Sequence, residues 1–416
     1  MIEWSETHLS IRDSIRKFCE AEVKPKLHAI EHEGEPPYEV LRKLIATFGI
    51  GDMARMTFAA QIAKQKAKQE RIAAGEAVEP PKERTRRPSP EAGMEMAMRL
   101  IPIIELSRHS PGMVTALGVS MGLTASAIMA RGTIAQKERW ALELLTLEKI
   151  GAWAITEPGS GSDAFGAMKS TARRSDAHGY VLNGSKTFIT NGPYADTIVF
   201  ICKLDEGNEP KERKVLSFVL DKGMTGLTQS KPLRKLGLHG SPTGELFLED
   251  VKVGKDRLLG ETEEQPSRAA TKETFTAERT AVAGMALGLV EECQRLAIDY
   301  ANTREQFGQK IGQFQLIQLK LAKMEVARMN IQNLVFRQIE MAGEGLSMTL
   351  AEASACKLYC AQAAMDVCNE TVQLFGGNGY MAEYRVEQLF RDARVLQIYG
   401  GTDEIQVSQI ARSLLG

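Results

Sequence analysis

The chain has few of the residues that build disulfide frameworks or zinc ribbons. Its 416 residues include only six cysteines, and no two of them form a C-x-x-C pair. Cys356 and Cys360 share a helix face, which makes a weak metal-ligand pair, but no histidine lies in that region. We therefore expect buried thiols in a reducing cytoplasm, and no bound metal.

An excess of charge of one sign is also missing. The formal net charge is −1, so no overall field favours nucleic acid or an anionic membrane. Residues 1–18 mix acids and bases from the start without an apolar segment of signal-peptide type, and no apolar run approaches membrane-spanning length. The sequence predicts a cytoplasmic protein without nucleic-acid or membrane partners.

What is present is the composition of a soluble globular protein of more than one domain, with 43% hydrophobic and 25% charged residues. Hydrophobic periodicity separates a helical region over 1–150, a region of short β-prone runs over 151–260, and a second helical region over 272–416. Because helices and strands are segregated, we expect an α+β fold. It consists of an N-terminal helical domain, a central β-barrel or sandwich, and a C-terminal four-helix bundle.

Individual segments support this division. Gly112 to Ala130 is apolar and rich in small residues, as in a buried helix. Thr197 to Cys202 and Val215 to Leu220 are β-prone, and the charged stretch 205–214 between them predicts a hairpin loop.

A basic, alanine-rich insertion at about 55–90 fits none of the three regions. Four cations precede a proline-rich stretch: Lys64, Lys66, Lys68 and Arg71. A solvated helix followed by a loop is the favoured interpretation, and a docking site for a partner or an anionic substrate group is the alternative. Nucleic-acid binding comes last, because no aromatic side chain is interleaved for base stacking.

Two segments rich in glycine, serine and threonine are the most informative part of the chain. The first reads WAITEPGSGSD over 153–163, and the second reads NGSKTFITNG over 183–192. Glycines let the backbone approach a ligand closely, and hydroxyls stand beside exposed N–H groups. Each segment alone predicts a strand–turn junction. Together they suit a flat polar cofactor whose ring edge accepts short hydrogen bonds.

In this order and spacing, the two segments closely resemble the flavin-binding signature of the acyl-CoA dehydrogenase family. The resemblance continues through REQFG at 304–308, QLFGGNGY at 373–380, FRDA at 390–393 and IYGGTDEI at 398–405. It is weakest between about Phe48 and Pro90, where the usual Pro-x-x-Tyr-Gly-Gly segment is replaced by the insertion. A single glycine-rich piece would be weak evidence, whereas several in family order are strong.

The resemblance implies that the cofactor is FAD. The first segment would hold the pyrimidine edge of the isoalloxazine ring through Trp153, Ile155, Thr156, Gly161 and Ser162, with Thr156 giving a hydroxyl. Phe188 takes the place of the family's aromatic residue against the ring, where Trp is frequent. Thr190 would lie near N5, the atom that accepts hydride.

A second set of residues matches family positions that meet the pyrophosphate and adenine of FAD across a subunit interface: Arg304, Phe307, Gln315, Gln373 and Gly377. Thr402 and Glu404 match residues near the FAD phosphates. Two of these residues could have a structural role in addition to binding FAD. Arg304 is also a cation at a helix end, and Gly377 belongs to a sequence that ends a helix. The shared site implies a homotetramer.

The position of the catalytic base departs from the commonest family pattern. Most members place a Glu directly after the Tyr of the C-terminal motif, and this chain has Gly400 there. A smaller subset, including isovaleryl- and long-chain acyl-CoA dehydrogenases, carries the Glu on the helix that begins the third region, where Glu278 and Arg279 match. Glu278 lies four residues before Val282, on the apolar face of the helix. Burying a carboxylate there is costly unless it has a charged partner or a catalytic role. The alternative is a first-turn Glu favoured by the helix dipole.

Gly400 still carries a backbone N–H. The family uses this donor, with a ribityl hydroxyl of FAD, to polarise the thioester carbonyl. Ser162, Arg279, Gly400 and Gly401 are the expected substrate contacts. His239 stands where the family often has Arg, and we expect a satisfied loop histidine.

The implied reaction is α,β-desaturation of an acyl-CoA thioester to the trans-2-enoyl-CoA. Glu278 would abstract the α-proton, hydride would pass to flavin N5, and electrons would leave to electron-transfer flavoprotein. The alternatives are an acyl-CoA oxidase, a desulfinase-like relative, and a flavoprotein homologue that binds DNA. A desulfinase-like relative would have lost the catalytic base, which fits Gly400 but not Glu278. The net charge of −1 argues against the homologue that binds DNA. A base on the upstream helix goes, in the family, with long or branched acyl chains.

Overall fold

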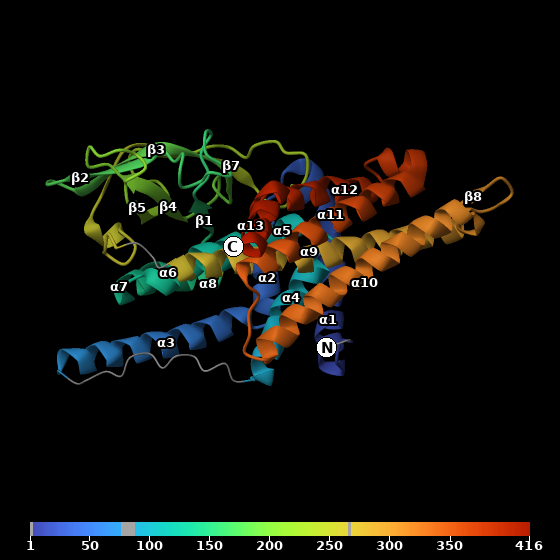
Figure 1. Ribbon diagram of the computed structural model, residues 1–416, viewed down its shortest axis with the longest axis horizontal. Coiled ribbons are helices and arrows are strands. Elements are labelled where there is room, and N and C mark those ends of the chain that lie inside the picture. Colours follow the sequence, from blue (N-terminus) through green and yellow to red (C-terminus); the bar gives the residue numbers. More distant parts are fainter. Residues whose placement is uncertain (1–2, 76–87, 265–267) are drawn as a thin grey trace.

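The computed structural model describes residues 3–75, 88–264 and 268–416, with the backbone alone over 268–275. Helices form the two ends of the chain and strands form its middle (Figure 1). The expected α+β fold is confirmed, with helical N- and C-terminal parts and a central curled sheet.

The N-terminal part is helical up to the first strand. Ser5 begins the first helix with a capping box, and Ser89 caps the fourth, in which Pro90 takes the first position. Its α-helices are α1 (Glu6–Phe18), α2 (Tyr38–Thr47), α3 (Ile50–Ala73), α4 (Pro90–Ser107), α5 (Pro111–Leu117), α6 (Ser126–Arg131), α7 (Ile134–Gln136) and α8 (Leu142–Leu145).

A long apolar helix runs from Pro111 to Arg131, through α5, the wide turns η4 (Gly118–Ala125) and α6. Its 21 residues reach a mean hydropathy of 1.6, so the expectation that no apolar run approaches membrane-spanning length was wrong here. The helix packs within the fold, because Gly151 N–H donates to Ser120 Oγ at 2.9 Å. A core helix passes the same test of length and composition, so this is weak evidence for a membrane span.

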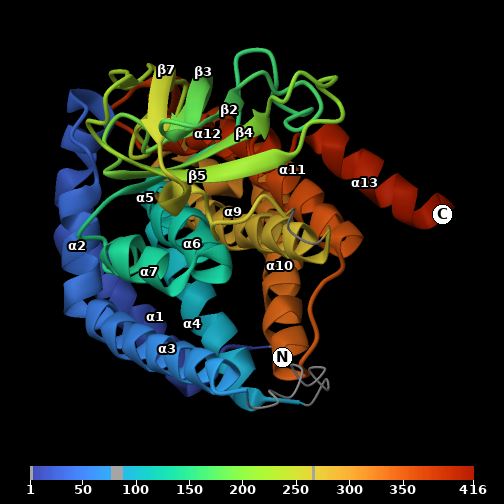
Figure 2. The ribbon, with the colours of Figure 1, turned by 90° about the vertical axis from the view of Figure 1, so that its left-hand side faces the viewer.

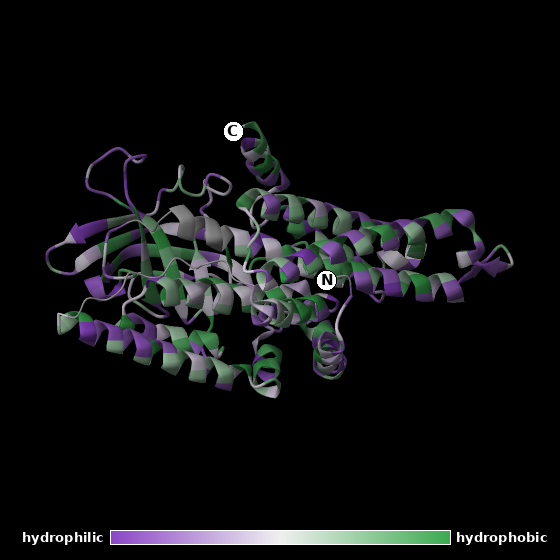
Figure 3. Cartoon of the chain, turned by 60° about the horizontal axis from the view of Figure 1, so that its bottom comes forward, coloured by the Kyte–Doolittle hydropathy of each residue, from purple (hydrophilic) through white to green (hydrophobic). Residues whose placement is uncertain are grey.

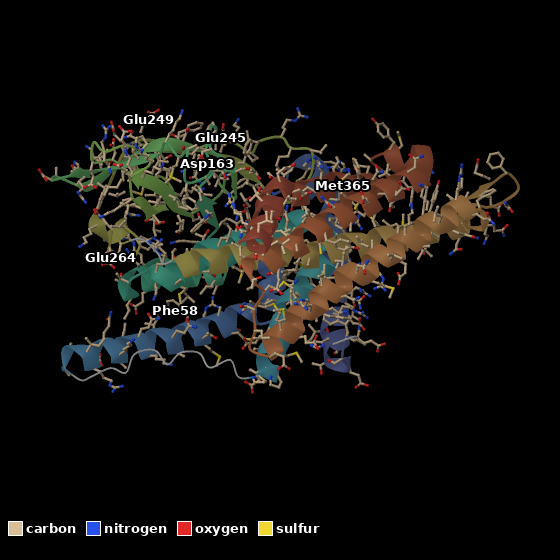
Figure 4. All side chains as sticks on the ribbon, viewed as in Figure 1. Phe58, Asp163, Glu245, Glu249, Glu264 and Met365 are labelled. Carbon is tan, nitrogen blue, oxygen red and sulfur yellow. The ribbon has the colours of Figure 1, made fainter. Side chains whose placement is uncertain are left out.

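Helix α3 is the expected solvated helix of the basic insertion, although it begins earlier, at Ile50. Most of its 24 residues are exposed. Phe58 and Ile62 are buried and pack with Ile128 and Trp140, and Figure 4 shows Phe58 on the side of α3 that faces the neighbouring helices. The loop expected after this helix falls largely on residues 76–87, which lie outside the described residues.

The central sheet has the order β1-β4-β2-β3-β7-β6, with β5 on the free side of β4. Strand β1 pairs with β4 in parallel, and β4 pairs with β5 antiparallel across residues 205–214, as the predicted hairpin loop requires. Phe200, Phe218 and Leu246 are among the core residues of this sheet. The strands are β1 (Gly151–Ala154), β2 (Thr171–Ser175), β3 (Gly179–Thr190), β4 (Thr197–Leu204), β5 (Val215–Asp221), β6 (Leu227–Gln229) and β7 (Thr243–Val253).

The C-terminal part is built on three long helices within the described chain, and α4 packs against the first two of them. Figure 2 shows the sheet on one side of the helices, with α3 crossing the opposite side. Hydrophobic segments continue along the bundle to its far end, where the small hairpin lies (Figure 3). The elements are α9 (Arg268–Thr303), β8 (Glu305–Gln306), β9 (Gln309–Lys310), α10 (Gln315–Gly343), α11 (Leu350–Phe375), η8 (Gly376–Tyr380), α12 (Val386–Arg394) and α13 (Asp403–Leu415).

All six cysteines are free and buried, as expected. Cys293 Sγ lies 3.5 Å from Cys368 Sγ between α9 and α11, and burial contributes to raising the pKa of the Cys360 and Cys368 thiols. Among the described residues, no group of three or more His, Cys, Asp or Glu could hold a metal ion.

Candidate active site

The two motif segments lie side by side at the edge of the sheet. Thr187 N–H donates to Thr156 O at 2.9 Å. The Lys186 ammonium donates to Ile155 O at 3.0 Å and to Glu157 Oε1 at 2.8 Å. Lys186 is fully buried, and burial lowers its pKa against the opposing pull of the Glu157 carboxylate. A buried ion pair therefore holds the two segments in register.

Phe188 occupies a bulge in β3. The register of β3 against β7 shifts between Lys186 and Ile189, and Phe188 has φ +56° with 68% of its surface exposed. A left-handed backbone costs a bulky residue on the order of 1–2 kcal/mol, and bulges re-aim side chains at functional sites. This strained, exposed aromatic ring fits a stacking partner for a flat cofactor.

The end of β3 is fixed to α5. Asn191 is buried, and its Nδ2 donates to Ala116 O and to Gly151 O, both at 2.9 Å. Tyr38 OH donates to Asn191 Oδ1 at 2.9 Å. The neighbouring Thr190 is thereby held beside the segment of α5 that contains Ala116.

The rest of the first segment lines the turn after β1. Trp153 is partly buried and packs with the cluster that includes Trp140 and Val199, so its side chain faces the helices rather than the solvent. Gly161 and Ser162 are exposed. A Cβ added to Gly161 would meet nothing within 4 Å, so the backbone of this turn is open to a ligand.

Glu278 lies on α9 and is partly exposed. Burial of the carboxylate raises its pKa, while the cations of Arg279 and Lys357 oppose the shift. Arg279 donates to Ser354 Oγ at 3.0 Å, and Lys357 is fully buried 3.3 Å from Asp403 Oδ1. A carboxyl group whose pKa is raised toward neutrality suits a general base.

The turn at Gly400 and Gly401 lies against this carboxylate. A Cβ added to Gly400 would lie 3.6 Å from Cδ of Glu278, and one added to Gly401 would lie 3.7 Å from an Arg279 nitrogen. Both glycines are left-handed, with φ +62° and +89°. The resemblance predicted both Glu278 and Gly400 for one reaction site, and the fold places the Gly400 turn next to the Glu278 side chain.

Tyr399 connects the carboxylate to α5. Its hydroxyl donates to Met285 Sδ at 3.2 Å. Burial raises the pKa of Tyr399, the Glu278 charge adds to this, and a hydrogen bond with Thr115 opposes it. Thr115 is the residue before Ala116, to which Asn191 is bound. Tyr399, the residue before Gly400, and Asn191, at the end of β3, are therefore both linked to the same turn of α5.

Thr402 and Glu404 lie at the start of α13. Thr402 is the N-cap, and Ile405 N–H donates to its hydroxyl at 3.4 Å. Glu404 is exposed, and hydrogen bonds from its own backbone and from the Thr402 hydroxyl lower its pKa. The N-terminus of a helix of this length favours an anionic group, which is compatible with the expected position near the FAD phosphates.

The remaining predicted residues form a second group at the far end of the bundle. Arg304 directly follows α9, and Phe307 is 94% exposed at the tip of the β8–β9 hairpin with φ +52°. Gln315 is the first residue of α10, and Gln373 lies exposed in the last turn of α11. A Cβ added to Gly377 would meet nothing within 4 Å.

Tyr300 joins the two motifs of this second group. Its ring stacks on Phe375 at 4.1 Å between centroids, and Asn378 Nδ2 donates to its hydroxyl at 2.9 Å. Figure 1 shows β8 far from β1. Since α9 rises about 1.5 Å per residue, its end lies roughly 38 Å from Glu278. One chain does not bring the two groups together.

Several supporting residues were missed from the sequence. Lys186 and Asn191 stand inside the second motif, and their buried, multiply bonded side chains are long-range features that a motif does not display. Lys357 and Gln406 lie outside every predicted set. His239 is a satisfied loop histidine as expected, and its hydrogen bonds with Glu31 and the Lys235 backbone raise its pKa to about 9.

Family models match the chain over most of its length. They are described as the N-terminal, middle and C-terminal domains of acyl-CoA dehydrogenase, and they match residues 5–58, 152–251 and 268–415. The residues around Glu278 and Gly400 fall within the third of these matches.

Curated relatives and solved structures are similar along the whole chain. A 3-(aryl)acrylate reductase of Clostridium sporogenes is 33% identical over 99% of both chains. The mitochondrial isovaleryl-CoA dehydrogenase of Pongo abelii is 36% identical over 77% of this chain and 75% of its own. The structure of butyryl-CoA dehydrogenase from Megasphaera elsdenii superposes with a TM-score of 0.82 at 30% identity and covers 100% of both chains.

Proposed function

The chain belongs to the acyl-CoA dehydrogenase family, and on that premise we propose that it is an FAD-dependent acyl-CoA dehydrogenase. It is an oxidoreductase, and the proposed reaction is the conversion of an acyl-CoA thioester into the trans-2-enoyl-CoA. The observation that carries the proposal is the contact between Glu278 and the Gly400 turn.

The roles of the chain's own residues follow from their chemistry. Glu278 takes the α-proton: it is the carboxylate beside the Gly400 turn, and burial raises its pKa, which strengthens it as a base. The Gly400 amide donates to no acceptor among the described residues, so it is free to meet the thioester carbonyl as negative charge develops on its oxygen. FAD, when bound, supplies the acceptor for the hydride that leaves the β-carbon.

Two features of the site support FAD as the cofactor. Phe188 is held exposed in a left-handed bulge, and the turn at Gly159 and Gly161 is open on its outer side. An exposed aromatic face and an open backbone are what a flat ring would use.

We further propose a homotetramer, in which a second copy supplies the Arg304 group to complete the site. The two groups of predicted residues lie at opposite ends of α9, so a cofactor long enough to need both must sit between chains. Apolar side chains exposed at the far end support this: Phe307, Leu316, Leu319, Val326 and Met329.

A second candidate function runs the same chemistry in the opposite direction. The similarity to a 3-(aryl)acrylate reductase covers 99% of both chains. Because each proton transfer is reversible, a protonated Glu278 could deliver the proton that reduction of an enoyl or acrylate substrate requires.

The deciding experiment is anaerobic bleaching of the flavin by straight, branched and aryl acyl-CoA thioesters. Bleaching by one of them supports the dehydrogenase, and bleached flavin that is reoxidised by an arylacrylate supports the reductase. Fast reoxidation by oxygen would favour an oxidase over transfer to electron-transfer flavoprotein. A colourless protein that gains no flavin on reconstitution would contradict both candidate functions. Salt-sensitive retention on DNA would favour the DNA-binding homologue.

A further inference from the structure

Gln406 makes an unusual pair of hydrogen bonds beneath the Gly400–Gly401 turn. It lies on α13 and is fully buried. Its Nε2 donates to Gly400 O at 3.0 Å and to Gly401 O at 2.8 Å. Since both acceptors are carbonyl oxygens, only the amide nitrogen can face them, and the orientation of this side chain is defined.

The turn has little else to fix its shape. Gly400 and Gly401 have φ +62° and +89°, and glycine visits many backbone conformations at low cost. Neither residue has a side chain to pack. Holding both carbonyls on one donor fixes the two peptide planes that follow Gly400. The plane before it, which carries the Gly400 N–H, begins at Tyr399, whose N–H donates to Val395 O at 3.0 Å and whose hydroxyl donates to Met285 Sδ. With both sides held, the direction of the Gly400 N–H is fixed.

A simple helix-capping role does not account for Gln406. Thr402 already caps α13 through its hydroxyl. The Oε1 atom of Gln406 is buried and meets no hydrogen-bond donor among the described residues. The side-chain hydrogen bonds of Gln406 therefore go to the glycine turn.

We propose that Gln406 is a positioning residue for the reaction: it holds the Gly400–Gly401 turn so that the Gly400 amide meets the thioester oxygen as charge develops there. The proposal rests on the function proposed above. It predicts that Gln406 acts on stabilisation of the enolate and not on binding of the acyl-CoA, because its hydrogen bonds reach the donor and not the substrate.

The test compares Gln406→Leu with Gln409→Leu, the same change one turn further along α13. Both proteins are titrated with a 3-oxoacyl-CoA, a thioester that ionises at its α-carbon without hydride transfer and whose enolate absorbs in the near ultraviolet. In Gln406→Leu we expect the pKa of the bound thioester to rise by about one unit or more. We expect kcat to fall about ten- to a hundred-fold, less than the loss of a whole oxyanion donor, with KM little changed.

Gln406→Glu is the second variant, because it keeps the size of the side chain. Its ionised carboxylate repels the two carbonyls, while its protonated form can donate to one of them. We expect the enolate signal of this variant, taken as a fraction of the wild-type signal at the same pH, to be lost at neutral pH and to return in part as the pH falls. If Gln406→Leu does not fold, Gln406→Glu alone tests the positioning role of Gln406.

The outcomes separate the inference from the function on which it rests. Enolate formation and kcat at wild-type values in a folded Gln406 variant would overturn the positioning role. A rise in KM alone, with the enolate pKa unchanged, would also overturn it, because it would mean a role in binding. A wild-type protein whose flavin no thioester bleaches would instead remove the proposed function itself.

Discussion

Glu278 lies beside Gly400, so that a Cβ added to the glycine would come to 3.6 Å from Cδ of the carboxylate. These are the two places from which the family delivers its catalytic base, according to the resemblance in the sequence. The fold places these two positions side by side, so we expect a carboxylate from either of them to reach the same substrate carbon.

Glu278→Gln should retain FAD and acyl-CoA binding and lose most of its flavin reduction. The amide is nearly isosteric but cannot accept the α-proton, and removal of a general base costs about 10²–10⁴ in rate. The measurement is stopped-flow bleaching of the flavin under anaerobic conditions. Glu249→Gln, on the outer face of the sheet in Figure 4, is the matched control and should bleach normally. Wild-type bleaching by Glu278→Gln would remove the assignment of the base.

Gly400→Glu in the Glu278→Gln background should restore part of the rate for short straight-chain thioesters. The new carboxylate would enter the space beside residue 278 from the other side. Rescue should be incomplete, because a non-glycine residue at φ +62° costs about 1–2 kcal/mol. The same bleaching assay measures it. Glu278→Gln, Gly400→Glu and the double variant could all bind FAD and yet fail to bleach. That result would mean that the two positions do not serve the same carbon.

Lys357→Met should move the acid limb of the kcat/KM profile to higher pH. The buried Lys357 cation opposes the desolvation that raises the pKa of Glu278, so its removal raises that pKa further. Since only the ionised carboxylate is a base, activity then appears at higher pH. The measurement is the pH dependence of kcat/KM for the wild type and the variant. An unchanged acid limb would mean that Lys357 only supports Asp403.

Glu278→Gln should also stabilise the folded protein, more at pH 8 than at pH 5. A carboxyl group whose folded pKa is raised binds its proton more tightly when folded, so it lowers stability as the pH rises through and above its unfolded pKa. Gln does not titrate and removes this loss, and a tenfold difference in proton affinity between the folded and unfolded chains corresponds to about 1.4 kcal/mol. Thermal unfolding at the two pH values measures it. An equal gain at both would point to packing instead of charge.

Arg304→Ala should lose FAD, and Phe307→Asp should dissociate the oligomer. Both residues are exposed in one chain at the end of the bundle where we propose that a second copy docks. Gel filtration with absorbance at flavin and protein wavelengths measures assembly and cofactor together. Arg173→Ala, an exposed arginine on β2, is the control. A monomer that keeps FAD tightly would contradict the shared site.

Hydrophobic periodicity predicted the fold class, and the family resemblance named Glu278 and Gly400, which the fold places next to each other. The sequence did not predict Lys186, Asn191 or Gln406 as supports. Each acts through contacts to segments distant along the chain or to backbone carbonyls, and such contacts leave no local pattern. One expectation was wrong: the Pro111–Arg131 helix is long and apolar enough to span a membrane by length and composition, although Ser120 joins it to β1.

The length of α9 has a genetic consequence. The helix carries Glu278 near one end and Arg304 just beyond the other, so in the proposed assembly each chain gives its base to one site and its arginine to another. Co-expression of Glu278→Gln chains with Arg304→Ala chains would then produce mixed pairs in which one site bears both lesions and the other bears none. Two inactive alleles would complement each other, restoring activity that neither homo-oligomer has.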